Sequence, residues 1–166
     1  MSDAGRGSRV STDEPLDLAD FLAAQQLDAE IVSPGVPMPS VAAAAAALRV
    51  APDRIFKSIL FAAADGRCAM AIACGTSRVD ATRLAALTGL GRLRLASPEV
   101  ALRVTGYPAG GTPPIGHRER FAVVVDTRVA AQEWGWGGGG RKELMVRIRS
   151  ADIVRLTGAT VADVIG

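Results

Sequence analysis

Cysteine and histidine are scarce in this chain of 166 residues, and their scarcity excludes whole classes of site. The two cysteines, Cys68 and Cys74, cannot form a disulfide framework, and neither belongs to a C-x-x-C pair. With His117 as the single histidine, a zinc site of cysteine and histidine ligands is not expected. We therefore expect no metal, no cofactor, and two small buried thiols in a reducing compartment.

Long apolar runs are also missing. The longest strongly apolar helical run, Val41 to Leu48, is far shorter than the roughly 20 residues that cross a bilayer. Residues 1–12 mix Gly, Ser, Arg and Asp and lack the apolar core of a secretory signal. These absences predict a cytoplasmic protein with no membrane partner.

Lysine is nearly absent, because Lys57 and Lys142 are the only lysines among 19 basic residues. The net charge of +2 permits a polyanionic partner without demanding one. No heptad repeat or long exposed apolar stripe indicates a dimer, so a monomer is expected. A lysine kept inside an apolar segment, as Lys57 is, stands out against this background.

The length and composition fit one globular domain. Hydrophobic residues make up 49% and charged residues 22%, close to globular averages. We expect a flexible tail at residues 1–14 and a single domain over residues 15–166.

Patterning and turn signals predict alternating helices and strands. The expected helices are 15–27, after a capping box at Ser11 to Glu14, then 41–49, 81–88, 98–105, and a last one between Ser150, its cap, and Gly158. The expected strands are 29–32, 55–63, 68–73, 93–95, 121–125 and 144–148, with a glycine-rich turn at 134–141.

The fold class that follows is α/β, with a mixed, partly closed barrel-like sheet surrounded by short helices. The strands 55–63 and 68–73 flank an Asp-Gly turn and read as an antiparallel hairpin, so the sheet cannot be wholly parallel. Both strands are apolar at most positions, which predicts a sheet covered on two faces.

Three familiar motifs fail on inspection. The segment 106–112 has the glycine spacing of a phosphate-binding loop, but Thr112 stands where lysine is required. Gly89-x-Gly91 lacks the third glycine of a dinucleotide fingerprint. Gly75-Thr-Ser lacks the closing glycine of a nucleophile elbow, and only His117 could serve as its base.

The remaining candidates each carry two interpretations. The loop 106–116 could aim backbone N–H groups at an oxyanion, or could be an ordinary surface loop. Lys57 could anchor a phosphate or a carbonyl oxygen, or could face solvent. Asp126 could act in catalysis, although capping the following turn is favoured. Trp134 is expected to pack, and His117 to be an exposed loop residue; its basic neighbours Arg118 and Arg120 could meet a nucleic-acid phosphate, although a solvated turn is the default.

An ordered set of segments resembles the YbaK/EbsC family, the prolyl-tRNA-synthetase-associated domains that hydrolyse wrongly charged aminoacyl-tRNA. The set comprises Arg54-Ile-Phe-Lys57-Ser58-Ile-Leu-Phe61, residues 105–116, Val123-Val-Val-Asp126 and Gly137-Gly-Gly-Gly140-Arg-Lys-Glu-Leu. The resemblance runs from about residue 28 to the end. It implies a mixed barrel-like sheet ringed by helices.

The resemblance also implies which residues form the site. Lys57 matches the family's required lysine, Asp126 its acidic residue after a central strand, and Gly110 to Pro114 its Gly-x-x-x-Pro loop. The catalytic group implied is Lys57, Gly110, Gly111 and Asp126. The implied substrate-binding residues are Ser58, Tyr107, Thr112, Pro113, Pro114, Gly138 and Gly139.

The function implied is that of a trans-acting aminoacyl-tRNA deacylase, which hydrolyses the ester of a mischarged tRNA, with tRNA(Pro) carrying a small or thiol amino acid as the expected substrate. The expected partners are the terminal adenosine end of aminoacyl-tRNA and an aminoacyl-tRNA synthetase. Two alternatives stay open: a non-catalytic module that binds tRNA or a synthetase, and a deacylase for a different small acyl ester.

Overall fold

The computed structural model describes residues 14–166. The expected tail at residues 1–14, apart from Glu14, and the Ser11 end of the predicted capping box lie outside these residues. The helices are α1 (Leu18–Gln25), α2 (Val41–Leu48), the 3-10 helix η1 (Pro52–Arg54), α3 (Ala81–Thr88), α4 (Pro98–Thr105), α5 (Thr127–Ala130) and α6 (Ser150–Thr157). The strands are β1 (Glu30–Val32), β2 (Phe56–Ala63), β3 (Cys68–Cys74), β4 (Leu93–Leu95), β5 (Ala122–Asp126), β6 (Trp134–Gly138), β7 (Met145–Arg149) and β8 (Thr160–Ala162).

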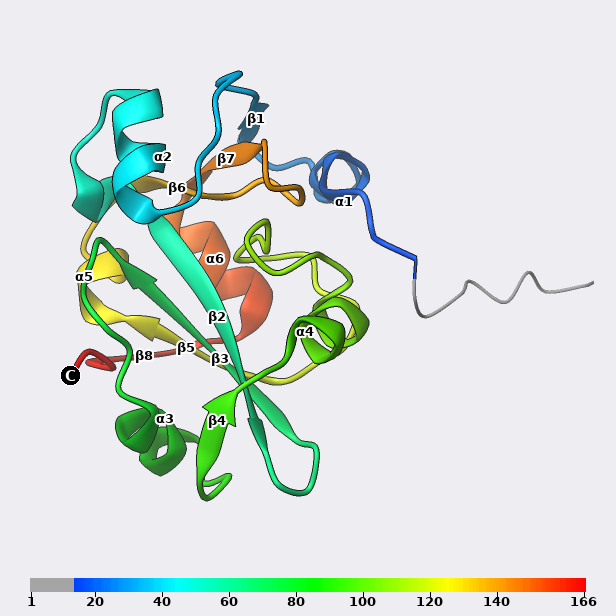
Figure 1. Ribbon diagram of the computed structural model, residues 1–166, viewed down its shortest axis with the longest axis vertical. Coiled ribbons are helices and arrows are strands. Elements are labelled where there is room, and N and C mark those ends of the chain that lie inside the picture. The colour runs from blue at the N-terminus through cyan, green and yellow to red at the C-terminus, as the bar shows by residue number, and fades with distance from the viewer. Residues whose placement is uncertain (1–13) are drawn as a thin grey trace, which may run out of the picture.

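The strands form two sheets, and the α/β class with mixed strand directions is confirmed. Five strands lie in the order β4-β2-β3-β5-β8, with β2 antiparallel to β3 and β4, and β5 parallel to β3 and β8. Three antiparallel strands lie in the order β1-β7-β6. Figure 1 shows the smaller sheet beside one end of the long β2–β3 hairpin. An isolated bridge joins Ile55 to Trp136 of the smaller sheet. The described strands form two sheets and no closed barrel is found among them, so the expected barrel-like closure is not confirmed.

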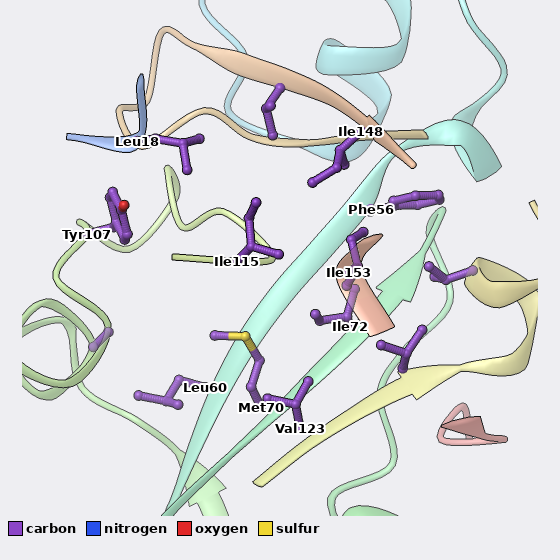
Figure 2. Packing of buried hydrophobic residues seen from close by; sticks show 14 of the residues in the cluster. Leu18, Phe56, Leu60, Met70, Ile72, Tyr107, Ile115, Val123, Ile148 and Ile153 are labelled. Atoms are coloured by element: carbon purple, nitrogen blue, oxygen red, sulfur yellow. The ribbon is translucent and has the colours of Figure 1, made fainter. Parts of the chain in front are cut away.

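Both faces of the five-stranded sheet are covered, as the apolar strands predicted. Side chains alternate along a strand, so Phe56 and Leu60 of β2 face one cluster while Phe61 faces another. The larger cluster lies between the two sheets and includes residues of α1, α4 and α6; Figure 2 shows Phe56 and Ile72 in it with Ile148 and Ile153. A third cluster packs α2 against the outer face of the smaller sheet.

Of the glycine-rich segment 134–141 that was expected to be a turn, residues 134–138 form strand β6, and residues 139–141 lie in the connection to β7. Strand β6 pairs with β7 from Trp134 opposite Arg149 to Gly138 opposite Met145. A Cβ on Gly135 would collide with the ring of Phe56, and one on Gly138 would collide with the carbonyl of Thr112. The glycines therefore let β6 lie directly against β2 and against the loop that precedes β5, which is a packing requirement rather than a turn signal.

Helix ends account for the other corrections. Helix α1 begins at Leu18 rather than near Pro15, because the Asp17 carboxylate accepts the Ala19 N–H and caps it there. The expected cap of α6, Ser150, is its first residue, and Arg149 is the N-cap without a side-chain bond. The sequence patterns did not predict the short elements η1, α5 and β8. None of the helices within residues 14–166 is long and apolar enough to cross a membrane.

Candidate active site

A cavity of about 980 Å³ opens between the two sheets and the loops at one end of β2. Four segments line it: residues 35–44 with the start of α2, residues 55–59 of β2 and the bridge before it, residues 109–112, and residues 138–145 around the β6–β7 connection. A cavity of this size can hold a nucleoside with a small acyl group.

The open edge of β2 presents unpaired backbone groups to this cavity. Strand β4 pairs with β2 only from Phe61 to Ala63, which leaves residues 56–59 without a β4 partner. The Leu60 carbonyl accepts the Ala96 N–H on this edge, at 2.9 Å. Because alternate residues of a strand present their backbone groups to the same side, the N–H and C=O of Ser58 point toward the same edge.

Lys57 is half-buried and its ammonium is held in place. Its Nζ donates a hydrogen bond to the backbone carbonyl of Ser77, in the segment after β3. Burial lowers the pKa of Lys57, and the nearby Cys74 sulfur opposes that shift. The side chain is therefore neither fully exposed nor fully buried, and its ammonium has a protein partner. A partly dehydrated ammonium at a cavity wall attracts an oxygen that carries or develops negative charge.

Ser58, the next residue of β2, has an unsatisfied hydroxyl. Its Oγ is buried and has no hydrogen-bond partner among residues 14–166. A buried hydroxyl without a partner costs free energy, and such groups call for an explanation. Ser58 lines the cavity, but its Oγ is closed to solvent and lies on the strand face that also carries Phe56 and Leu60.

The loop at 110–114 offers fewer free amides than its glycines suggest. The Gly111 N–H already donates to the Pro108 carbonyl at 3.0 Å, and Pro113 and Pro114 have no N–H. The amides of Gly110 and Thr112 have no acceptor within the described part of the chain. The expected oxyanion donors therefore reduce to these two, and both residues line the cavity.

The comparisons with known proteins agree with this geometry. The family model described as an aminoacyl-tRNA editing domain matches residues 36–156. The chain belongs to the aminoacyl-tRNA editing domain family. That match includes every residue that lines the cavity except Gly35, from the loop before α2 to the β6–β7 connection.

Individual relatives share the fold and part of the sequence. A proline--tRNA ligase of Geobacillus thermodenitrificans (strain NG80-2) is 34% identical over 92 residues, which is 55% of this chain and 16% of the ligase. The editing domain thus corresponds to less than a fifth of that relative. Among solved structures, hypothetical protein APE2540 has a TM-score of 0.81 at 30% identity, with 90% of this chain and 99% of that one covered. A candidate trans-editing enzyme for prolyl tRNA synthetase has a TM-score of 0.80 at 28% identity, with 90% and 94% covered.

The editing domain brings five of the expected site residues together and leaves six outside the cavity lining. Those that line it are Lys57, Ser58, Gly110, Thr112 and Gly138. Those that do not are Tyr107, Gly111, Pro113, Pro114, Asp126 and Gly139. Several of the second group support the lining: the Gly111 carbonyl accepts the Gly140 N–H at 2.8 Å and joins the loop to the β6–β7 connection.

Asp126 is fully buried away from the cavity and makes structural hydrogen bonds. Its carboxylate accepts the Arg128 N–H at 2.9 Å and the Val164 N–H at 2.9 Å. The Arg128 guanidinium contacts it and also Asp163, at 3.1 and 3.2 Å. The favoured interpretation of Asp126 as a cap is confirmed, and the carboxylate also fastens the C-terminal segment to β5.

Tyr107 was expected to bind substrate and His117 to be an exposed loop residue. Both side chains are more buried than these roles require. Tyr107 has 0% exposure in the main cluster, beside Leu18 in Figure 2, and its hydroxyl has no partner within residues 14–166. Burial raises the pKa of Tyr107 to about 12. His117 is partly buried behind the loop, so the expectation of an exposed histidine is wrong.

Trp134 packs as expected, with the guanidinium carbons of Arg147 and Arg149 at 4.0 and 4.3 Å from its ring centroid.

Sequence reasoning assigned no role in the cavity to the proline-rich loop before α2, nor to Lys142 and Glu143. Residues 35–41 form one wall, and Met38 and Val41 contribute apolar surface to it. The three prolines in this loop were interpreted only as a chain break. The rarity of lysine was the available signal for Lys142, since both lysines of the editing domain line the same cavity.

Proposed function

We propose that this editing domain is a trans-acting aminoacyl-tRNA deacylase that hydrolyses the ester of a mischarged tRNA in the cytoplasm, as a monomer. The expected substrate is tRNA(Pro) carrying a small or thiol amino acid. Family membership supports the reaction class. The relatives described as proline--tRNA ligases and as a candidate trans-editing enzyme for prolyl tRNA synthetase support the choice of tRNA.

The observation that carries this proposal is that Lys57, Ser58, Gly110 and Thr112 line one cavity, and that the amides of Gly110 and Thr112 have no acceptor within residues 14–166. Lys57 and Ser58 come from the open edge of β2, and Gly110 and Thr112 come from the loop before β5. Hydrogen bonds already hold the Lys57 ammonium and the Thr112 side chain, at the carbonyls of Ser77 and Pro108. Such preorganised donors stabilise negative charge without having to reorganise during the reaction.

The reaction needs no strong nucleophile. Water adds to the ester carbonyl, whose oxygen becomes negatively charged in the tetrahedral intermediate. The bond to the ribose oxygen of the terminal adenosine then breaks, and that oxygen takes a proton, which gives a free amino acid and an uncharged tRNA. The ester is already activated by its α-ammonium group, so positioning and oxyanion stabilisation lower the barrier enough. We assign the substrate carbonyl to Lys57 and the Gly110 and Thr112 amides.

The apolar lining suits a small amino acid side chain. Met38, Val41, Ala44, Ile59 and Met145 contribute apolar surface to the cavity. A pocket of this kind excludes larger side chains by volume and separates neighbours that differ by one methylene by about 1–3 kcal/mol.

The test is release of amino acid from tRNA(Pro) mischarged with alanine, cysteine, serine or threonine. The wild type should deacylate at least one of the four, and Lys57→Ala should lower kcat/KM on that substrate by at least about 100-fold. Arg94→Ala is the matched control, because Arg94 is an exposed cation on β4 outside the cavity. It should keep full activity.

Two results would overturn the proposal. One is the absence of release from every tRNA in the panel by folded protein. The other is a folded Lys57→Ala variant with wild-type rates. Binding of tRNA without turnover, insensitive to replacement of Lys57, would favour the non-catalytic module. Turnover of acyl-adenosine mimics in preference to acylated tRNA would favour an esterase for a different small substrate.

A further inference from the structure

Lys142 stands at the mouth of the cavity with a defined path for its side chain. It is exposed, lies in the connection between β6 and β7, and lines the cavity together with Lys57. A Cβ built on Gly110 would lie 3.8 Å from both Cγ and Cε of Lys142. The aliphatic stem therefore passes over Gly110, and the ammonium is carried across the loop that holds the two free amides.

The charges around the cavity leave Lys142 available for a ligand. The charged residues that line the cavity are Lys57, Lys142 and Glu143. The Lys57 ammonium uses one of its three donors on the Ser77 carbonyl, and the proposed function assigns the others to the ester carbonyl. Within residues 14–166, Lys142 makes no ion pair with any carboxylate, its neighbour Glu143 included. The cavity thus has one ammonium fixed in its wall and a second, unpaired ammonium at its mouth.

We propose that Lys142 binds the phosphodiester that joins the terminal adenosine of the tRNA to the preceding nucleotide. This inference rests on the proposed function, because it places the acylated end of a tRNA in the cavity. It divides the work between the two lysines: Lys57 acts at the ester carbonyl, and Lys142 anchors the backbone that leads out of the cavity.

The placement follows from the different hydration of the two substrate groups. The ester linkage itself carries no charge and can enter the half-buried part of the cavity, whereas a phosphodiester keeps its charge and is costly to dehydrate. The phosphate should therefore stay at the solvent side, where the exposed cation is Lys142. A flexible ammonium with three donors suits a phosphate that is met as a point charge.

The neighbouring residue Arg141 offers a matched control. It is a cation in the same connection and is also exposed, but it does not line the cavity. Lys142→Met removes the charge and keeps a stem able to lie over Gly110, and Arg141→Met removes a charge one residue away. Lys142→Arg restores the cation. A general attraction between the protein and RNA would respond equally to both methionine variants, whereas a localised contact would not.

The experiment measures binding of the uncharged trinucleotide CCA and of adenosine, by titration at several salt concentrations. Lys142→Met should weaken CCA binding about fivefold, reduce the slope of log K against log salt by about 0.7, and leave adenosine binding unchanged. Lys142→Arg should retain most of the affinity, and Arg141→Met should change it less than twofold. In deacylation assays, Lys142→Met should raise KM with kcat unchanged.

The outcomes separate this inference from the deacylase proposal. If CCA binding depends on Lys142 but no mischarged tRNA is hydrolysed, the phosphate contact stands and the deacylase proposal fails. If amino acid is released but Lys142→Met and Arg141→Met bind CCA alike, the deacylase proposal stands and this inference is overturned. It is also overturned if the wild type does not bind CCA, or if Lys142→Met weakens adenosine as much as CCA.

Discussion

His117 ties the cavity loop to the protein interior, and its titration should make stability depend on pH. Its Nε2–H donates to the Pro113 carbonyl at 2.8 Å, and its ring lies 5.1 Å from the ring of Phe121, centroid to centroid. Burial lowers the pKa of His117 from 6.5 to about 4, although the bond to Pro113 opposes the shift. The folded protein therefore holds this ring neutral down to a pH at which an exposed histidine would be protonated.

The size of the effect follows from proton linkage. Below pH 6.5 the unfolded chain binds a proton at His117, while the folded chain does not until the pH approaches about 4. The stability that the neutral ring contributes is complete above pH 6.5 and is lost as the pH falls through this window. With these two pKa values, lowering the pH from about 7.5 to about 5 removes about 2 kcal/mol.

The assay is urea unfolding of the wild type and of His117→Gln at both pH values. Glutamine can still donate an N–H toward Pro113 but does not titrate, and the carboxylates titrate alike in both proteins. The wild type should lose about 2 kcal/mol more than the variant between the two conditions. Equal losses in the two proteins would refute the assignment of a neutral His117 ring in the folded protein, whatever their stabilities at pH 7.5.

Two further substitutions test residues that the structure places outside the cavity. Tyr107→Phe removes a buried hydroxyl without a partner, so we expect thermal denaturation to show a gain of up to about 1 kcal/mol with deacylation unchanged; a loss of stability would contradict this. Asp126→Ala leaves the Val164 N–H and the Arg128 guanidinium without their acceptor, so chemical denaturation should show a loss of about 2–4 kcal/mol. A variant of Asp126 that keeps its stability and loses kcat would instead support a catalytic role.

Secondary structure was predictable from the sequence where the local turn and cap signals agree with the packing of the folded protein. The hairpin of β2 and β3 is apolar on both faces and turns at Asp65-Gly66, and helices α3 and α4 carry their own caps at Asp80 and Ser97. In each case a local signal coincides with the tertiary structure, because the cap or turn satisfies backbone groups wherever the element lies.

The error at β6 arose because glycine has two different uses. In isolation, Gly135 and Gly137 to Gly140 favour a turn. In the fold, Gly135 accommodates the Phe56 ring and Gly138 accommodates the Thr112 carbonyl, partners that are distant in sequence. Steric requirements of this kind depend on residues about 80 and 26 positions away, respectively, so no local pattern can distinguish them from turn chemistry.

The sequence also could not predict which groups the buried Asp126 carboxylate contacts. Asp126 follows a buried strand in the way that both a catalytic acid and a capping residue would. Its role was decided by the C-terminal segment, because β8 pairs with β5 and brings the Val164 N–H to the carboxylate. Since no local expectation existed for β8, the partner that fixes Asp126 was absent from the prediction. The sequence could favour the capping role of Asp126, but it could not predict the hydrogen bond from the Val164 N–H.

The cavity itself depends on a sheet edge that is left open. Strand β4 covers only the far end of β2, and β6 approaches the near end at the Ile55–Trp136 bridge, so the segment 56–59 lies between two partners without a full one. An edge of this kind normally invites another chain, and covering it with loops protects it. Here the covering loops carry Gly110, Thr112 and Lys142, so the segments that shield the edge also supply the groups we assign to the substrate. A change that lengthened the β2–β4 pairing toward Ser58 would therefore remove the site while making the sheet more regular.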